Sequence, residues 1–313
     1  MDPARTLHCI VRLARLLAAA LALLAAAQSA QAVSCATFSS PGWSLTYDPF
    51  AAVAATTTST VNLTCTRQTG DPKNVTLTIT ANSGLNPGAA GQALLAGSGA
   101  LLQYGNYTDV TNTLVWNAGG NSLSITLSFG GIGSTASGSV PFYANIPAGQ
   151  TTLPPSGASF YTDTISLQLL EKGTPVSATT FPVSVAINPL CTISTAPGAL
   201  TFSYTSLQGT PGAAISSFAV TCTNTVPYTA SLDAYSVTDA AVNLSYTVNL
   251  GQTTRPPGSA YSPGAALSAT GSGLAQTISI DGAMPADQSG TCATATCTNA
   301  ASANNIRTLM ITY

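Results

Sequence analysis

The chain has 313 residues, of which 45% are hydrophobic and only 6% are charged, and its formal net charge is −2. It therefore lacks the basic surface of a nucleic-acid-binding protein, and its aliphatic content is too high for a disordered chain. Abundant Thr, Ser, Gly and Ala predict an exported all-β protein instead.

The first 32 residues have the layout of a secretory signal peptide. Three arginines precede an apolar run, residues 16–27, and the segment ends in the cleavage pattern Ala30-Gln31-Ala32. A membrane anchor is the alternative, but the run is shorter than the roughly 20 residues that a spanning helix needs. We expect cleavage near Ala32, a mature chain that begins at Val33, and loss of the only histidine, His8.

The cysteines of the mature chain predict disulfide bonds, because the number is even and export leads to an oxidising compartment. Almost the same number of residues separates the first two and the next two, which suggests one bridge used twice, and the last two would close a small local loop. Other pairings remain formally possible. A zinc site is not expected, because there is no C-x-x-C motif and no histidine. The six cysteines are Cys35, Cys65, Cys191, Cys222, Cys292 and Cys297.

The two halves of the mature chain resemble each other. Residues 35–47 and 191–204 each contain a cysteine, a Pro-Gly turn and an alternating aromatic segment. Residues 146–150 and 284–288 also match. Short strands of period two between Gly-, Pro-, Asn- and Ser-rich turns predict two β-sandwich domains, residues 33–188 and 189–313.

The two halves end differently. Residues 161–170 form a predicted strand that continues through a hairpin turn into a last strand, residues 180–187. The corresponding strand of the second half, residues 305–313, ends the chain, and we align Thr164–Leu167 with Thr308–Ile311. The second sandwich is thus expected to lack its final strand and to expose an acceptor edge. The alternative is an ordinary edge strand of a smaller sandwich.

Several motifs resemble the spore coat protein U domain, the pilin-type module of archaic chaperone–usher secreted pili. They are the two cysteine units and the segments Leu102–Asp109, Leu114–Trp116, Phe142–Gln150 and Phe160–Thr164. The second half departs from the pattern at Asp281–Pro285 and in the Cys292–Cys297 loop. The resemblance implies an all-β fold with two immunoglobulin-like, pilin-type sandwiches and no cofactor.

The resemblance also implies partners: a periplasmic chaperone, an outer-membrane usher and an adjacent pilin that donates an N-terminal strand. Only Val33 and Ser34 precede Cys35 in the expected mature chain, so this subunit would accept a strand and donate none, as a tip adhesin does. The chain would reach the cell surface as part of a pilus and support attachment and biofilm formation. A shaft or coat subunit is the alternative.

The candidate site residues form two groups. Leu309, Ile311 and Tyr313 are expected to line the acceptor groove or to contact the chaperone. Leu94, Leu95 and Ile132 lie in apolar loops and are candidates for adhesion, because exposed apolar clusters mark interaction sites. Leu94 and Leu95 could instead begin a buried strand.

Two other functions compete with surface adhesion. A lectin-like tip would use polar groups around Asn106, Asp109 and Asn112. Catalysis is not expected, since no histidine survives and Asp109 and Asp163 stand beside turns, where Asp bonds its own backbone. Trp43 and Trp116 are expected in the core rather than at a binding surface. No catalytic, cofactor or metal residue is predicted.

Overall fold

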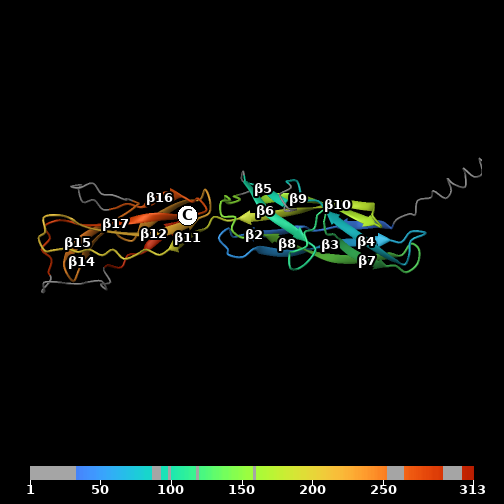
Figure 1. Ribbon diagram of the computed structural model, residues 1–313, viewed down its shortest axis with the longest axis horizontal. Coiled ribbons are helices and arrows are strands. Elements are labelled where there is room, and N and C mark those ends of the chain that lie inside the picture. The colour runs from blue at the N-terminus through green and yellow to red at the C-terminus, as the bar shows by residue number, and fades with distance from the viewer. Residues whose placement is uncertain are drawn as a thin grey trace, which may run out of the picture.

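Two β-sandwiches follow each other along an elongated molecule in the computed structural model (Figure 1). Every regular element in the described part of the chain is a β-strand. No helix there is long and apolar enough to cross a membrane. The structure describes residues 33–86, 93–97 (backbone only), 100–117, 120–157, 160–251, 264–291 and 305–313.

The N-terminal sandwich consists of the first ten strands. Their bounds are β1 Ser34–Ser39, β2 Trp43–Tyr47, β3 Ala55–Thr66, β4 Asn74–Ala81, β5 Ala93–Gly97, β6 Ala100–Tyr107, β7 Leu123–Ser128, β8 Thr135–Ile146, β9 Tyr161–Glu171 and β10 Thr174–Ile187. One layer has the order β1-β3-β8-β6, and the other has the order β2-β10-β9-β4-β7. Strand β5 pairs with both β6 and β9, so it joins the two layers at one side.

Alternating burial places one face of each strand in the core. In β9 the residues Ile165, Leu167 and Leu169 are fully buried, and the residues between them face solvent. This follows from the two-residue period of a strand, which sends successive side chains to opposite faces. The long apolar faces of β9 and β10 therefore meet the opposite layer across the sandwich.

Both tryptophans lie in the core of the N-terminal sandwich, as predicted. Trp116 is 2% exposed and packs against Phe142 and Phe181, with ring centroids 5.0 and 6.3 Å away. Trp43 is 7% exposed, and its indole Nε1 donates a hydrogen bond to the side-chain oxygen of Asn106 at 2.9 Å. Neither ring is available as a binding platform.

The C-terminal sandwich contains the remaining strands. Their bounds are β11 Cys191–Thr195, β12 Gly212–Cys222, β13 Pro227–Leu232, β14 Ser236–Asp239, β15 Leu244–Leu250, β16 Leu267–Thr270, β17 Ala275–Met284 and β18 Leu309–Thr312. One sheet has the order β11-β12-β17-β15-β14, and the second has only β16-β13-β18 among the described residues. A separate apolar core lies between these sheets.

Each sandwich begins with the same disulfide. Cys35 is bonded to Cys65 and Cys191 to Cys222, in both cases linking the first strand to its antiparallel neighbour. Cys292 and Cys297 lie outside the described residues. The predicted use of one bridge in both halves is thus present in the fold.

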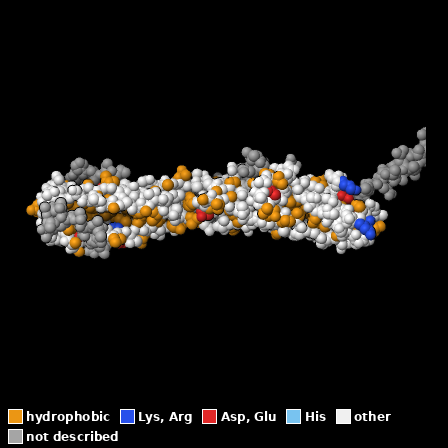
Figure 2. All heavy atoms as spheres, turned by 60° about the horizontal axis from the view of Figure 1, so that its bottom comes forward, with side chains coloured by type: hydrophobic (Ala, Val, Ile, Leu, Met, Phe, Trp, Pro, Cys, Tyr) orange, Lys and Arg blue, Asp and Glu red, His pale blue; other side chains and the backbone are white. Residues whose placement is uncertain are grey.

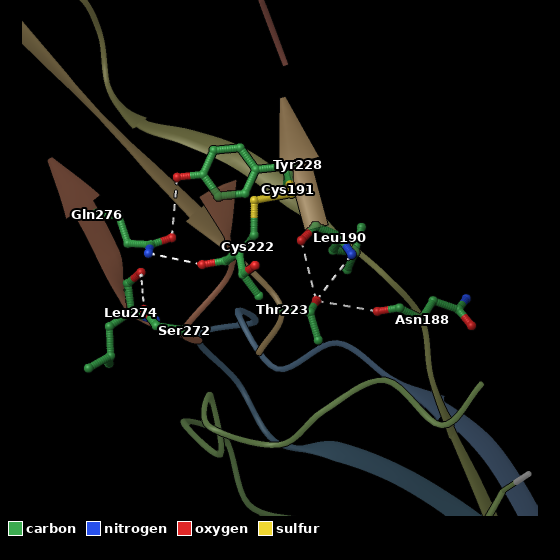
Figure 3. Close-up of a disulfide and its surroundings, with 10 residues drawn as sticks. Asn188, Leu190, Cys191, Cys222, Thr223, Tyr228, Ser272, Leu274 and Gln276 are labelled. Carbon is green, nitrogen blue, oxygen red and sulfur yellow. Dashed lines mark hydrogen bonds between the residues drawn. A yellow bond between two sulfur atoms is a disulfide. The ribbon is translucent and has the colours of Figure 1, made fainter. Parts of the chain in front are cut away.

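The connection between the sandwiches is held by Thr223, directly after the second disulfide (Figure 3). Its buried hydroxyl group accepts a hydrogen bond from the Leu190 N–H at 3.1 Å and lies 3.4 Å from the Asn188 carbonyl oxygen. The Asn224 side chain donates to the Thr152 carbonyl at 2.6 Å, so the two sandwiches are also in direct contact. The connection is therefore anchored on both sides.

Candidate functional site

A shared hydrogen-bond motif aligns the two sandwiches residue by residue. The backbone N–H of Gln150 donates to the Tyr47 hydroxyl at 3.2 Å, and that of Gln288 donates to the Tyr204 hydroxyl at 2.8 Å. The side-chain amide of Gln150 also bonds the backbone N–H and carbonyl of Gln103. That of Gln288 bonds the same two groups of Ser245. Tyr204 therefore occupies the place of Tyr47.

A second hydrogen-bond motif aligns β9 with β18. The backbone N–H of Asn82 donates to the Ser166 carbonyl, and the Asn82 side chain accepts from the Ser166 N–H. Asp233 and Thr308 make the same two bonds at 3.1 and 3.0 Å. Thr308 therefore occupies the place of Ser166.

This equivalence corrects the sequence alignment of β9 and β18 by two residues. Leu309 corresponds to Leu167, Ile311 to Leu169 and Tyr313 to Glu171. The Tyr104 hydroxyl donates a hydrogen bond to the Asp163 side chain, and the Tyr246 hydroxyl donates one to the Asn305 side chain. Matching Asn305 with Asp163 gives the same alignment of the two strands. The sequence could not decide this, because a shift of two residues leaves an alternating pattern unchanged.

In the N-terminal sandwich, β10 fills the space between β9 and β2. It pairs antiparallel with β9 and parallel with β2, where Val183, Val185 and Ile187 stand opposite Trp43, Leu45 and Tyr47. The residues of β10 that enter the core are at most 1% exposed. They are Phe181, Val183, Val185 and Ile187.

In the C-terminal sandwich, no strand in the described part of the chain occupies that place. Strand β18 pairs with β13 on one side, and no described strand pairs with its other side. The counterpart of β2, residues 200–204, forms no strand, and no described strand pairs with it. We call the space between residues 200–204 and β18 the open edge.

The side chains on both sides of the open edge are only partly covered. Leu200, Leu309 and Ile311 pack against the core of the C-terminal sandwich but keep part of their surface exposed. Phe202 is also partly exposed, and its ring packs against Tyr246 with centroids 5.5 Å apart. Leu167 and Leu169, the counterparts of Leu309 and Ile311, are fully buried. Figure 2 shows apolar side chains running along this half of the molecule.

The three residues predicted for the groove do not behave alike. Leu309 and Ile311 lie on the inner face of β18, whereas Tyr313 follows the end of the strand and is 56% exposed. On the opposite side of the groove, the sequence analysis did not name Leu200, Phe202 and Tyr204. Their alternating apolar pattern was the available signal.

The residues predicted for adhesion lie far apart. Ile132 is 65% exposed in the turn between β7 and β8. Backbone hydrogen bonds join this turn to Arg67 and Lys73, at the end of the sandwich that is remote from the second sandwich. Leu94 and Leu95 lie in β5, whose Ala96 pairs with Thr162 near the other end of β9. Since β9 rises about 3.3 Å per residue, roughly 30 Å separates these ends. The side chains of Leu94 and Leu95 lie outside the described residues.

The remote end, which we call the distal pole, is basic. Figure 2 shows Lys and Arg side chains gathered at the end of the molecule where the grey N-terminal trace leaves. Lys73 and Lys172 are exposed, whereas the nearby acids Asp71 and Glu171 are 6% and 7% exposed. Arg67 directs its guanidinium group to the carbonyl oxygens of Asp71 and Gly130.

The polar residues considered for a lectin site stabilise their own loops. Asn106 is 6% exposed and receives the Trp43 bond, and Asn112 has a positive φ of 54°. Asp109 accepts hydrogen bonds from the Thr111 hydroxyl and from the backbone N–H groups of Thr113 and Leu114. These bonds, that from Thr111 foremost, hold the pKa of Asp109 below its usual range. This is the expected role of an aspartate beside a turn.

The titratable groups of the core are likewise used for structure. Burial and the hydrogen bond to Asp163 raise the pKa of Tyr104 well above its usual value, which keeps the hydroxyl protonated as a donor. Asp163 also accepts from the backbone N–H groups of Leu85 and Thr164. Among the described residues, no group of three or more His, Cys, Asp or Glu side chains could hold a metal ion.

The sequence profile of the Spore Coat Protein U domain matches residues 20–168, which include β1 to most of β9. The N-terminal sandwich is therefore similar to this family over most of its length. The match confirms the resemblance found in the sequence, and it ends before the second sandwich begins. The internal equivalences described above, rather than the profile, relate the C-terminal sandwich to the first.

Two solved structures resemble the chain. The CsuC–CsuE chaperone–tip adhesion subunit pre-assembly complex of Acinetobacter baumannii is 15% identical over 88% of this chain and 99% of the other, with a TM-score of 0.46. The CupB6 tip adhesin of Pseudomonas aeruginosa is 10% identical over 80% and 88% of the two chains, with a TM-score of 0.37. No curated protein matches the chain significantly.

Proposed function

We propose that the chain is the tip subunit of a chaperone–usher pilus and that the open edge accepts a strand from the adjacent pilin. One observation carries this proposal: the place filled by β10 in the N-terminal sandwich has no strand in the described part of the C-terminal one. An exposed strand edge above a partly covered apolar core favours pairing with another chain. The adjacent subunit would supply what this chain does not.

The first sandwich defines the strand that would fit. It would run antiparallel to β18 and parallel to residues 200–204, as β10 does with β9 and β2. Its apolar residues would alternate, as in β10, and three of them would stand opposite Leu200, Phe202 and Tyr204. Backbone bonds to both sides would add affinity, and the alternating side chains would select the partner.

Export follows from the same proposal. The signal peptide of residues 1–32 would direct the chain to the periplasm, where the disulfides form. A chaperone would cover the open edge until the usher replaces it with the adjacent pilin. Leu309, Ile311 and Tyr313 would contact the chaperone before assembly, and Leu309 and Ile311 would contact the donated strand afterwards.

The N-terminal sandwich would carry the adhesive function in surface attachment and biofilm formation. The open edge joins the C-terminal sandwich to the fibre, so the distal pole would be its free end. Ile132 would contact an apolar surface there, beside the basic residues Lys73 and Lys172. Leu94 and Leu95 would form a second contact on the side of the sandwich. A surface of this kind supports adhesion to solid materials, and the basic groups make attachment sensitive to salt.

A peptide with the sequence of β10 tests the acceptor proposal. It should bind the mature protein and raise the melting temperature of its C-terminal sandwich. The control peptide has the same composition, with the apolar residues placed next to one another so that no face of the strand carries all of them. Equal effects of the two peptides, or no binding of either, would exclude the open edge as an acceptor.

Adhesion needs a separate test on assembled pili. Replacing Ile132 with Ser should weaken attachment to plastic without changing pilus assembly, and replacing Leu94 and Leu95 should do so independently. Unchanged attachment by normal pili would remove these residues from the adhesive surface. Inhibition by a free sugar, with no effect of detergent, would favour the lectin-like alternative.

A further inference from the structure

The first residue expected in the mature chain is buried at the distal pole. Val33 is only 2% exposed and belongs to the core of the N-terminal sandwich. Its backbone nitrogen lies 3.1 Å from Oε2 of Glu171, which is 138 residues away in the sequence. The structure thus directs the N-terminal nitrogen of the mature chain at a carboxylate.

Glu171 is an unusual residue for this position. It ends β9, pairs with Leu77 of β4 and Thr174 of β10, and is only 7% exposed. Among the described residues, no Lys or Arg side chain lies within 4 Å of its carboxylate. A buried carboxylate with no cationic partner is costly, so a positive charge beside it would stabilise the fold.

We propose that Glu171 is a binding site for the α-ammonium group of Val33, which signal-peptide removal creates. Hydrolysis of the Ala32–Val33 peptide bond adds one water molecule, leaving a carboxyl group on Ala32 and an amino group on Val33 that takes up a proton. A single neutral N–H donor to Glu171 thereby becomes a cation with three N–H donors. Processing replaces a neutral hydrogen bond with an ion pair, which is stronger at a buried position.

The site is specific for the product of one cleavage position. The Val33 side chain is fixed in the core, and β1 begins at the next residue, where Ser34 pairs with Thr66. One additional residue would move the ammonium group about 3.5 Å along the chain, out of hydrogen-bond distance from Glu171. Only a chain that starts at Val33 can make the ion pair.

The site would also tie down the end of the chain. Glu171 lies directly before the Lys172-Gly173 turn, so the ion pair would join the N-terminus to the β9–β10 hairpin. The residues before Cys35 would then be held in the core of their own sandwich rather than extended toward a neighbour. This inference rests on the proposed export with signal-peptide removal.

Amine labelling of the protein exported with its own signal peptide tests the site. The mass of the N-terminal peptide should first show that the chain begins at Val33. With a limiting amount of an amine-reactive reagent, the exposed Lys73 and Lys172 should react, and the Val33 amino group should react at least about tenfold more slowly than in the unfolded protein, because its nitrogen is buried.

Two variants serve as the comparison. Glu171→Gln removes the charge, and an alanine inserted between Ala32 and Val33 moves the new ammonium group while keeping Glu171. Each should raise the labelling of the N-terminus and lower the melting temperature, and the combined variant should lower it no further, because both remove one interaction. Equal labelling in all proteins, additive losses of melting temperature, or a mature chain that begins elsewhere would overturn the proposal.

The β10 peptide distinguishes this failure from a failure of the proposed function. Its binding to the C-terminal sandwich should be the same in the mature protein and in both variants. Normal peptide binding with an unprotected N-terminus would reject the Glu171 site alone. Loss of peptide binding in every protein would reject the acceptor edge and leave the labelling result valid.

Discussion

The two sandwiches share a pattern of strands and differ in how it is completed. In the first, β10 follows β9 through a two-residue turn and covers the core with four apolar side chains. In the second, β18 has no such neighbour among the described residues, and residues 200–204 remain outside any strand. Among the described residues, the two sandwiches thus differ in whether a strand pairs with the second side of β9 or of its counterpart β18.

The comparison also shows which contacts of the C-terminal sandwich form without a counterpart of β10. The disulfide, the Tyr–Gln motif and the bonds between Asp233 and Thr308 are present in the C-terminal sandwich without a β10 equivalent. Tyr204 and Thr308 occupy the places of Tyr47 and Ser166, which pair with β10 in the first sandwich, so these bonds form in the second without that pairing. They would keep the open edge in the geometry needed to receive a partner.

The largest effect is expected when the missing strand is supplied. A copy of residues 172–187 appended after Tyr313 should close the C-terminal sandwich, because Tyr313 occupies the place of Glu171. Each of its four core side chains contributes about 1.5–3 kcal/mol on burial. The melting temperature of this sandwich, measured by calorimetry, should rise by more than about 10 °C.

The control is the same copy with serine at the four core positions. It has the same length and turn but no apolar face, so it should leave the melting temperature unchanged. If both copies stabilised the protein equally, the open edge would not be a site for an alternating strand.

Equivalent leucines should respond differently in the two sandwiches. Leu167→Ala should cost about 2–5 kcal/mol, since the side chain is fully buried. Leu309→Ala should cost less, because part of its surface is already in water. With the appended strand present, the cost at Leu309 should approach that at Leu167, as measured by urea unfolding. Equal costs in the unmodified protein would contradict the partial exposure.

Replacing Asp163 with Asn introduces the residue type of the second sandwich into the first. Asp163 accepts three hydrogen bonds, including that of the Tyr104 hydroxyl at 2.7 Å. The amide nitrogen of Asn would face a donor at one of them, so we expect a loss of about 1–3 kcal/mol in the free energy of unfolding. The loss should be smaller when Tyr104 is already Phe. Additive losses would show that the two side chains do not interact.

The smallest effect is expected at the contact between the sandwiches. A Cβ on Gly273 would lie 2.0 Å from the Thr151 carbonyl oxygen, whereas a Cβ on Gly133, which has nearly the same φ, would meet nothing within 4 Å. Both Gly→Ala variants carry the strain of a positive φ, about 1–2 kcal/mol. Only Gly273→Ala should also loosen the contact and speed proteolysis in residues 188–190. Equal proteolysis of both variants would contradict the direct contact.

Much of the fold could be predicted because its signals are local. Alternating apolar residues indicated the strands, Lys172-Gly173 the hairpin turn, and the spacing of cysteines one bridge in each half. The correspondence of β18 to β9 followed from comparing the two halves, although its register did not. Trp43 and Trp116 were expected in the core because tryptophan is highly buried on average.

The register and the surfaces could not be predicted in the same way. Alternation does not distinguish Leu309 from Ile311 as the counterpart of Leu167, so the alignment was wrong by two residues. Tyr313 shares the apolar pattern of β18 but lies beyond the paired residues. Ile132 and β5 both belong to apolar segments, yet the fold places them at different ends of β9.

The sequence by itself determined the all-β class and the resemblance of the two halves, because each depends on the order of residues along the chain. Only the tertiary structure decided which residues face the open edge, which end of the first sandwich is remote from the second, and that the nitrogen of Val33 meets Glu171. These depend on contacts between segments more than 100 residues apart, whose register is set by packing and hydrogen bonds rather than by local pattern.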